Sequence, residues 1–519
     1  MSAHHRAPAA RRGRDRKAVV VPAHPGRPTA AGPPPRCAVV GGGIAGLAAA
    51  TALAERGVRV TLYERDTALG GRLAGWPTEL ADGSAVTMSR GFHAFFRQYY
   101  NLRGLLRRAD PGLERLRPLP DYPLRHSSGL HDSFARVPRT PPWSAVGFSL
   151  LSPSFGLRDL ARMNPRAALP LFDVRASEIH RRYDGVSALE LLDRIGFPTA
   201  AQHLAFEVFS RSFFADPAEL SAAELALMFH IYFLGSSEGL LFDVPDEPYP
   251  QALWDPLTRH LQRRGVDIRT GTAVTGLGPS SHGGHVIHTP QTTEQVDAVV
   301  LALDTAGLRT LVAASPDLCD AAWRARIGRL RTAPPFLVSR IWLDRPVAAH
   351  RPGFLGTSGY GPLDNISVLS AWEGEAARWA AKTGGAVLEL HAYAADPAAV
   401  PESLDRALVE QLHRVYPETR SARVVDRRLQ WRQDCPLFAV GGHTDRPTVD
   451  TPEPTVTLAG DLVRTDLPVA LMERAATTGF LAANAHLRRW GLHGQTLWTV
   501  PDRGRSAPLR LLARRYGDR

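Results

Sequence analysis

Three glycines and one glutamate near the start of the chain have the spacing that binds the phosphates and ribose of a dinucleotide. Gly41-x-Gly43-x-x-Gly46 follows a short apolar run, and Glu64 lies eighteen residues after Gly46. Gly41 permits a tight turn, Gly43 lets the backbone approach a pyrophosphate, and Gly46 lets a helix lie close to a sheet. Glu64 is placed to accept the ribose hydroxyls.

The segments around these residues must form a βαβ unit for the motif to work. Ala38-Val39-Val40 predicts a buried strand, and the second strand runs from Val58 to Tyr63. An alanine-rich helix begins at Ile44 and Ala45, whose N–H groups and about half a positive charge face the phosphates. The alternative, a membrane anchor over 38–54, is disfavoured because this stretch contains clustered glycines and is shorter than the ~20 residues that span a bilayer.

The composition indicates a globular protein of two lobes with charged ends. A chain of 519 residues is too long for one ordinary core, and 44% hydrophobic with 22% charged residues is typical of a folded protein. The net charge of +11 resides in 1–36, with eight Arg or Lys and one Asp, and in 491–519, with six Arg and two Asp. The rest is neutral, which argues against a nucleic-acid partner because such proteins carry a basic folded face.

The two basic segments have two interpretations. Residues 1–36 are rich in Pro, Arg and Ala without periodicity, so we expect a disordered basic leader, and 491–519 a basic C-terminal tail. They either stay solvated without a partner or hold the protein to an anionic membrane surface. The second interpretation predicts a cytoplasmic protein, peripheral at the inner face of the membrane.

Cysteine usage agrees with a reducing compartment. Cys37, Cys319 and Cys435 form no CxxC pair, and Arg11-Arg12 is not followed by an apolar export segment. Three cysteines are too few for an iron–sulfur cluster or a zinc site of the usual kind, so no metal is expected.

A second glycine motif follows the βαβ unit. After Glu64 come Arg65 and then Gly70-Gly71-Arg72, which simple NAD binding does not require. The motif resembles the GG-Arg signature of the flavoprotein group that contains amine oxidases and carotenoid desaturases. The resemblance implies that the backbone here passes the FAD pyrophosphate and that Arg72 lies beside it.

The end of the chain carries the matching half of that resemblance. A strand ends in Gly460-Asp461, and a helix that begins near Pro468 contains Met472 in its start. In this flavoprotein group the Asp bonds the ribityl chain, the helix N–H groups face the flavin pyrimidine, and the Val274 position lies against the adenine. The resemblance therefore implies FAD, in an α/β fold with a Rossmann-like domain of the amine-oxidase type interleaved with a mixed α+β substrate domain.

The domains are expected to be discontinuous. We assign 37–105, 245–333 and 426–490 to the FAD-binding domain, and 106–244 and 334–425 to the substrate-binding domain. Within the second, periodicity predicts strands at 336–343, 366–371 and 387–393 and a helix at 401–416.

The run Gly91-Phe-His-Ala-Phe-Phe-Arg-Gln-Tyr-Tyr-Asn-Leu-Arg103 points to the substrate. From Phe95 onward its apolar residues also fit an amphipathic helix on the core. The run is similar to that of plant-type phytoene and ζ-carotene desaturases and closer still to isorenieratene synthases. The resemblance implies β-carotene as substrate and aromatic end rings, formed by desaturation with a methyl shift, as the product.

A long apolar segment lies in the middle of the chain. Ser221 and Glu224 have the spacing of a capping box, so a helix should start there and continue through Leu225–Leu234. This run is too short to span a bilayer. It is either a buried helix, the lining of an apolar tunnel, or a segment that dips into one leaflet.

The residue that removes a proton is not identified by pattern. Asp243 stands where related desaturases carry an acidic loop, His93 lies in the signature run, and Glu207 is the third candidate, although each also fits a structural role. The electron acceptor is left open among oxygen, a quinone and a protein. Alternative functions are a desaturase or isomerase of linear carotenes, a flavin amine oxidase, and a carotenoid- or flavin-binding protein without turnover.

Overall fold

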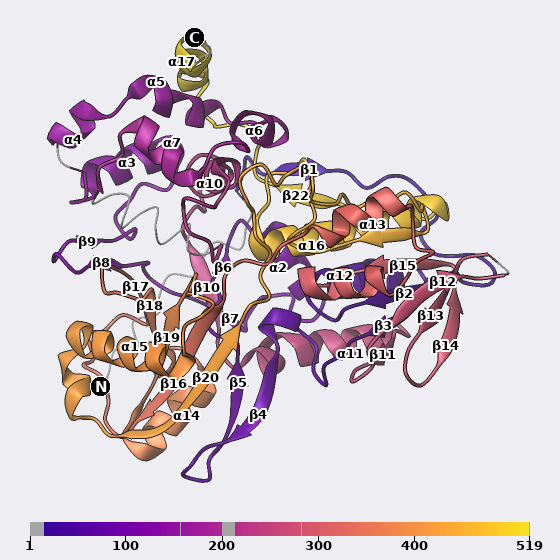
Figure 1. Cartoon of the computed structure of the whole chain (residues 1–519), viewed down its shortest axis with the longest axis horizontal. Helices are drawn as coiled ribbons and strands as arrows, with labels where there is room; N and C mark the ends of the chain where they lie inside the picture. Colours follow the sequence, from indigo (N-terminus) through magenta and orange to yellow (C-terminus); the bar gives the residue numbers. More distant parts are fainter. Residues whose placement is uncertain (1–14, 156, 200–212, 282, 518–519) are drawn as a thin grey trace.

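The computed structural model describes residues 15–155, 157–199, 213–281 and 283–517. Figure 1 shows three parts that meet near the centre: a parallel sheet with its helices on the right, a larger sheet at lower left, and a group of helices at upper left.

The Gly-rich turn belongs to a five-stranded parallel sheet in the order β11–β3–β2–β15–β21. Its strands are β2 (Arg36–Val40), β3 (Arg59–Tyr63), β11 (Asp267–Arg269), β15 (Ala298–Leu301) and β21 (Val456–Leu458). Helix α1 (Ile44–Ala54) is buried along its whole length because α16 (Leu471–Arg489) packs against it. A Cβ on Gly479 of α16 would lie 2.2 Å from the Ala45 carbonyl oxygen, so small residues set this close contact.

The second sheet has seven strands in the order β20–β16–β19–β18–β17–β8–β9. Its strands are β8 (Leu124–His126), β9 (His131–Asp132), β16 (Phe336–Leu343), β17 (Phe354–Ser358), β18 (Asn365–Val368), β19 (Ala386–Ala392) and β20 (Val424–Arg432). The strands predicted at 336–343 and 387–393 are confirmed as β16 and β19, and the predicted helix as α15 (Pro401–Val415). The strand predicted at 366–371 is only half right, because β18 ends at Val368 and the 3-10 turn η6 (Leu369–Ala371) follows. Leu388, Leu390 and Ala392 of β19 join the core that includes α15, so the intervening residues face the other side.

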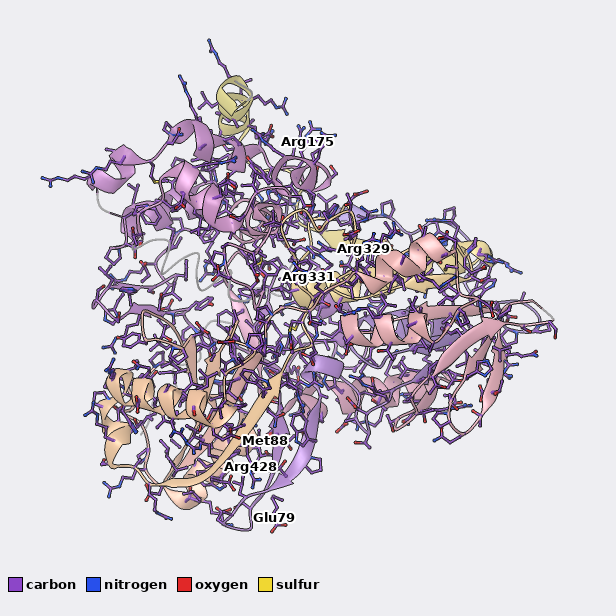
Figure 2. All side chains as sticks on the ribbon, viewed as in Figure 1. Glu79, Met88, Arg175, Arg329, Arg331 and Arg428 are labelled. Carbon is purple, nitrogen blue, oxygen red and sulfur yellow. The ribbon has the colours of Figure 1, made fainter. Side chains whose placement is uncertain are left out.

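A hairpin of β4 (Gly75–Glu79) and β5 (Ala85–Ser89) leans on this sheet. Arg428 of β20 donates a hydrogen bond of 2.7 Å to the Glu79 carbonyl, and both residues are labelled at the lower edge of Figure 2. The hairpin therefore connects the Gly70–Arg72 turn to the seven-stranded sheet.

The helical part contains α3 (Trp143–Leu151), α4 (Leu157–Arg162), α5 (Pro165–Ala168), α6 (Ala176–Tyr183), α7 (Ala188–Ile195) and α10 (Ala222–Phe229). Helix α10 begins after Ser221, as expected, and continues as a buried π-helical turn, η4 (His230–Leu234). The capping-box prediction is wrong for Glu224, because its carboxylate instead forms ion pairs with Arg446 and Arg474.

The signature run also differs from one continuous helix. Phe95–Phe96 is a short strand, β6, paired with β10 (Phe242–Pro245), and α2 begins only at Tyr100 and ends at Leu106. Pairing with β10 overrides the helical spacing of the first residues.

The expectation of a disordered leader is wrong from Asp15 onward; residues 1–14 lie outside the described residues. Val19–Val21 forms β1, which pairs antiparallel with β22 (Leu497–Thr499), and Asp15 accepts hydrogen bonds from Ser237. The basic tail is likewise folded, with α17 (Ala507–Gly517) packed near Leu169–Asp173 at the top of Figure 1. The strand that pairs with β1 lies hundreds of positions away in the sequence, so composition alone does not predict the pairing.

In the described part of the chain, no helix combines the length and apolarity needed to cross a bilayer.

Candidate active site

One cavity of about 640 Å³ runs from the Gly-rich turn to the seven-stranded sheet. The first end is lined by the predicted dinucleotide residues, namely Gly41, Gly43, Ile44, Ala45, Glu64, Arg65, Gly70, Gly71, Arg72, Val274, Gly460, Asp461 and Met472. Gly46 lies beneath this wall, where a Cβ would come within 1.9 Å of the Gly41 carbonyl oxygen. The structure thus brings together residues from both ends of the sequence.

Close backbone approach explains the glycines at this end. Gly41 has φ +110°, and a Cβ there would lie 2.3 Å from the Ala302 carbonyl oxygen. Gly43 and Gly71 face each other, since a Cβ on Gly71 would lie 3.1 Å from the Gly43 Cα. Side chains at these positions would fill the channel that the two turns enclose.

Two helix N-termini open on the same cavity. Among the described residues no side chain caps α1 at Gly43 or α16 at Ala470, and the first residues of both helices line the cavity. Uncapped N–H groups with a positive helix dipole favour an anionic or carbonyl group. Glu473, in the first turn of α16, faces away: its carboxylate accepts the N–H groups of Asn101 and Leu102, and burial raises its pKa to about 8.

Glu64 and Arg65 lie side by side in sequence at the cavity wall formed by the predicted dinucleotide residues. Glu64 accepts hydrogen bonds from the N–H groups of Gly42 at 2.7 Å and Asp66 at 2.9 Å, which fixes its carboxylate at the end of β3. Burial raises the pKa of Glu64. Arg65 is more exposed and pairs with Asp304 at 3.4 Å.

The other end of the cavity is an aromatic chamber. We define it by the residues Phe92, Phe96, Tyr99, Tyr122, Phe214, Tyr232, Phe242, Phe336, Phe354 and Tyr393. Phe92 stacks on Phe354 with 4.4 Å between ring centroids, and Tyr122 meets Phe354 edge-on at 5.1 Å. Such walls suit a long apolar molecule and offer ring faces to a positive charge.

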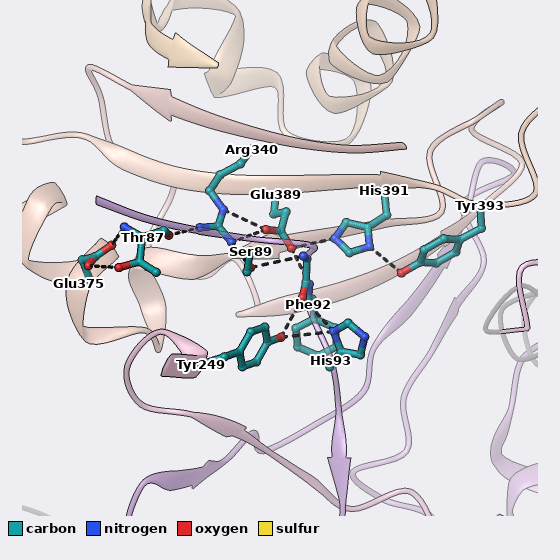
Figure 3. Close-up of polar contacts among 11 residues, drawn as sticks. Thr87, Ser89, Phe92, His93, Tyr249, Arg340, Glu375, Glu389, His391 and Tyr393 are labelled. Atoms are coloured by element: carbon teal, nitrogen blue, oxygen red, sulfur yellow. Dashed lines mark hydrogen bonds and ion pairs between the residues drawn. The ribbon is translucent and has the colours of Figure 1, made fainter. Parts of the chain in front are cut away.

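A buried polar network that the sequence analysis missed borders the aromatic chamber (Figure 3). Glu389 and His391 lie on the same face of β19, Tyr393 follows directly after the strand, and His391 and Tyr393 line the cavity. Arg340 of β16 holds the Glu389 carboxylate through Nε at 3.0 Å and Nη2 at 2.8 Å. Burial alone would raise the pKa of Glu389, but Arg340 and a hydrogen bond from His391 lower it to about 2. Polar residues at every second position of an apolar strand were the available signal.

The three predicted catalytic residues lie in different surroundings. His93 lines the cavity; its Nδ1 donates to the Gly91 carbonyl at 3.0 Å, so Nε2 is the acceptor, and burial lowers its pKa to about 4. Asp243 is buried in β10 and paired with Arg103 and Arg97, and it is not part of the cavity lining formed by described residues. Glu207 falls outside the described residues.

Comparison with known proteins assigns this architecture. The sequence profile described as flavin containing amine oxidoreductase matches residues 44–487, most of the chain. The chain belongs to this family. The amine oxidoreductase fold confirms the predicted α/β class, with its Rossmann-like part and a second mixed part.

Within the amine oxidoreductase family, the chain is similar to carotenoid phi-ring synthases. It is 70% identical over 503 residues to that of Streptomyces griseus, covering 97% of both chains. It is 28% identical to that of Chlorobaculum tepidum, covering 91% of each. At this identity and coverage, the chain belongs to the carotenoid phi-ring synthase group.

Solved oxidoreductases share the fold at low sequence identity. Cyclohexylamine oxidase from Brevibacterium oxydans superposes with a TM-score of 0.63 at 15% identity, covering 88% of this chain and all of the other. An oxidoreductase from Methanosarcina mazei gives 0.61 at 18% identity, covering 86% and 98%.

The family implies a flavin cofactor, and the residues present fit one. The facing glycines leave a channel without side chains, two uncapped helix N-termini open on it, and Glu64 offers a carboxylate. This donor and acceptor set suits a nucleotide with phosphates.

Proposed function

We propose that this chain is an FAD-dependent carotene oxidoreductase that converts the end rings of β-carotene into aromatic rings. The observation that carries this proposal is one continuous cavity, in which the wall of predicted dinucleotide residues continues into the aromatic chamber. The 70% identity to a carotenoid phi-ring synthase supports the same substrate and product.

FAD is the flavin that these residues suit. Glu64 would accept the adenosine ribose hydroxyls, with Val274 beside the adenine, and the Gly43–Gly71 channel with the α1 N-terminus would hold the pyrophosphate. Asp461 would bond the ribityl chain, and the backbone N–H groups at Met472 would face the pyrimidine carbonyl. All of them line the cavity.

The chemistry divides between cofactor and protein. The bound flavin supplies an acceptor for hydride, and aromatising one ring removes two hydride–proton pairs while one methyl group moves to the neighbouring carbon. The aromatic chamber holds the ring, excludes water and presents ring faces to the positive charge that follows hydride loss. The chain must also supply a proton acceptor.

The substrate is dissolved in lipid, and α3 offers a path for it. Trp143, Leu150 and Leu151 are 63%, 65% and 59% exposed on its outer side, and the helix contains no charged residue. Its inner side lines a second, apolar cavity of about 300 Å³. Met228 and Tyr232 line both cavities and therefore separate them.

Charges near α3 favour an anionic bilayer as the surface that it touches. Arg136 and Arg139 precede the helix and Arg158 and Arg162 follow it, all exposed. Basic residues around an apolar face bind acidic headgroups while the apolar side chains enter the leaflet. The membrane surface expected from the basic ends is thus proposed at α3, because the described parts of those ends are folded.

The function is tested with the purified, flavin-loaded protein and β-carotene in liposomes, with pigments analysed by chromatography and mass. Oxygen, a quinone and an oxidised electron-transfer protein are supplied separately to identify the oxidant. We expect products with one and then two aromatic rings. Unchanged β-carotene with every acceptor refutes the proposal; turnover of phytoene, ζ-carotene or an amine instead selects one of the alternative functions.

A further inference from the structure

A tyrosine, a histidine and a glutamate stand in line at the wall of the aromatic chamber (Figure 3). Tyr393 Oη lies 2.6 Å from His391 Nδ1, and His391 Nε2 lies 2.8 Å from Glu389 Oε1. Glu389 and His391 are 0% and 2% exposed. Buried polar groups arranged in this way polarise one another.

The chemistry of the partners fixes the proton positions. An ionised carboxylate only accepts hydrogen bonds, so His391 Nε2 carries the proton and Nδ1 is the acceptor. Tyr393 must then donate its O–H to Nδ1. Asn365 Nδ2 donates to the phenol oxygen at 3.1 Å, which occupies one of its two lone pairs and leaves the other for the cavity that Tyr393 lines.

The surrounding residues hold this arrangement rigidly. Glu389 also accepts the Phe92 N–H at 2.6 Å, and Arg340 donates two further hydrogen bonds, to the Thr87 carbonyl and the Ser89 hydroxyl. Gly91 packs on the imidazole so closely that a Cβ there would lie 2.8 Å from His391 Cε1. An imidazole clamped between a carboxylate and a phenol is oriented for proton transfer.

We propose that Tyr393 and His391 are the catalytic proton acceptor of the ring aromatisation, with Glu389 and Arg340 as positioning residues. This inference rests on the proposed function. After hydride loss and methyl migration, a ring C–H bond breaks and its electron pair forms the new C=C bond. The proton passes to the Tyr393 oxygen as the phenol proton moves to His391 Nδ1, and the imidazolium is balanced by Glu389. No electrons are exchanged in this step, and the extra proton later leaves to solvent.

His93 is the competing acceptor, since its Nε2 also has no proton. Among the described residues no hydrogen bond joins His93 to a carboxylate, and burial lowers its pKa to about 4, so the protein does little to stabilise a protonated His93. The two assignments predict different variants to fail.

The test compares Tyr393→Phe, His391→Gln and His93→Gln in the flavin-loaded protein with β-carotene liposomes. Tyr249→Phe is the matched control, because it removes a buried phenol that donates to the Gly91 carbonyl instead. We expect aromatic product to form roughly 100-fold or more slowly in Tyr393→Phe and His391→Gln, with unchanged flavin content and melting temperature, and normally in the control.

A solvent isotope effect separates catalysis from support. Product formation by the wild-type protein should be slower in D2O, because the phenol proton moves in the step, and this effect should vanish in Tyr393→Phe. The proposed role of Tyr393 and His391 is refuted if Tyr393→Phe forms aromatic product at the wild-type rate, or if only His93→Gln loses activity. A wild-type protein that makes no aromatic product instead refutes the proposed function.

Discussion

Arg72 and Asp461 form an ion pair with 2.6 Å between Nη2 and Oδ1 at the wall of the main cavity. Arg72 follows the first glycine turns and Asp461 follows β21, so the pair connects the two sequence motifs that predicted the cofactor. Both side chains line the cavity and keep part of their surface accessible from it.

Substituting either member of this pair should weaken flavin binding. Arg72→Ala leaves the Asp461 carboxylate unpaired at the wall of the proposed flavin site, and a lost charged hydrogen bond corresponds to roughly tenfold or more in affinity. The flavin content of purified protein, read from its visible absorbance, measures this. Arg329→Ala, which breaks an exposed pair with Asp445, should leave the flavin content unchanged; an equal loss there would contradict the prediction.

Glu224→Gln should strongly destabilise the fold. The Glu224 carboxylate is 1% exposed and pairs with Arg446 and with Arg474 of α16, so it joins the helical part to the dinucleotide part. Removing one member of a buried ion pair leaves uncompensated charge and costs about 3–5 kcal/mol. Urea unfolding measures the change, with the exposed Glu219→Gln as control. A shift below 1 kcal/mol, on the order of an exposed pair, would show that the cluster is solvated.

Stability should fall as the solution is acidified from neutral pH, in part through His486. Burial lowers the pKa of His486 to about 4, with its Nε2 3.0 Å from the Thr457 hydroxyl oxygen. The folded state therefore binds fewer protons than the unfolded state, and this contribution, complete above the unfolded pKa, is lost as pH falls toward 4.

The contribution of His486 to the free energy of unfolding should fall by about 2 kcal/mol between pH 7 and pH 5. The difference in unfolding free energy between these two pH values should shrink by that amount in His486→Asn. The exposed His131→Asn should keep the wild-type difference, and an undiminished difference in His486→Asn would rule out this histidine as its source.

Replacing Leu150 and Leu151 of α3 by serine should detach the protein from anionic vesicles. Each leucine contributes about 1.5–3 kcal/mol when it leaves water, so the double variant should bind roughly 100-fold or more weakly. Vesicle flotation measures binding, with the exposed Leu189→Ser on α7 as control. If the double variant still binds vesicles, and binding is lost only when the basic residues near the chain ends are removed, the membrane contact lies at the chain ends and not at α3.

The local sequence pattern predicted the elements whose burial follows a regular spacing of apolar residues or glycines along the chain. Continuous apolar runs predicted the buried strands β2 and β15, and the pattern of apolar residues predicted β16 and β19. The spacing of the glycines predicted the turns. The residues predicted to bind the dinucleotide all line the main cavity except Gly46, which packs beneath its wall, and their role in binding stays a prediction.

Distant pairings were not readable. Phe95–Phe96 has helical spacing but forms a strand with β10, and Glu224 fits a cap but turns to Arg446 and Arg474. The proposed proton relay shows the same limit: Glu389 and His391 lie on β19 and Tyr393 directly after it, but their arrangement depends on Arg340 and on the loop at Gly91, which only the fold brings to them.

The pairing of β1 with β22 also sets an order of events during synthesis. Val19–Val21 leaves the ribosome long before Leu497–Thr499, and at about 5–20 residues per second the interval is roughly half a minute to a minute and a half. During that time the first strand lacks β22, whereas the parallel sheet can be completed as soon as β21 has been made. The Val19–Val21 segment can therefore pair only after translation has reached β22. A protease site placed beside this segment should be protected only in molecules that have finished translation.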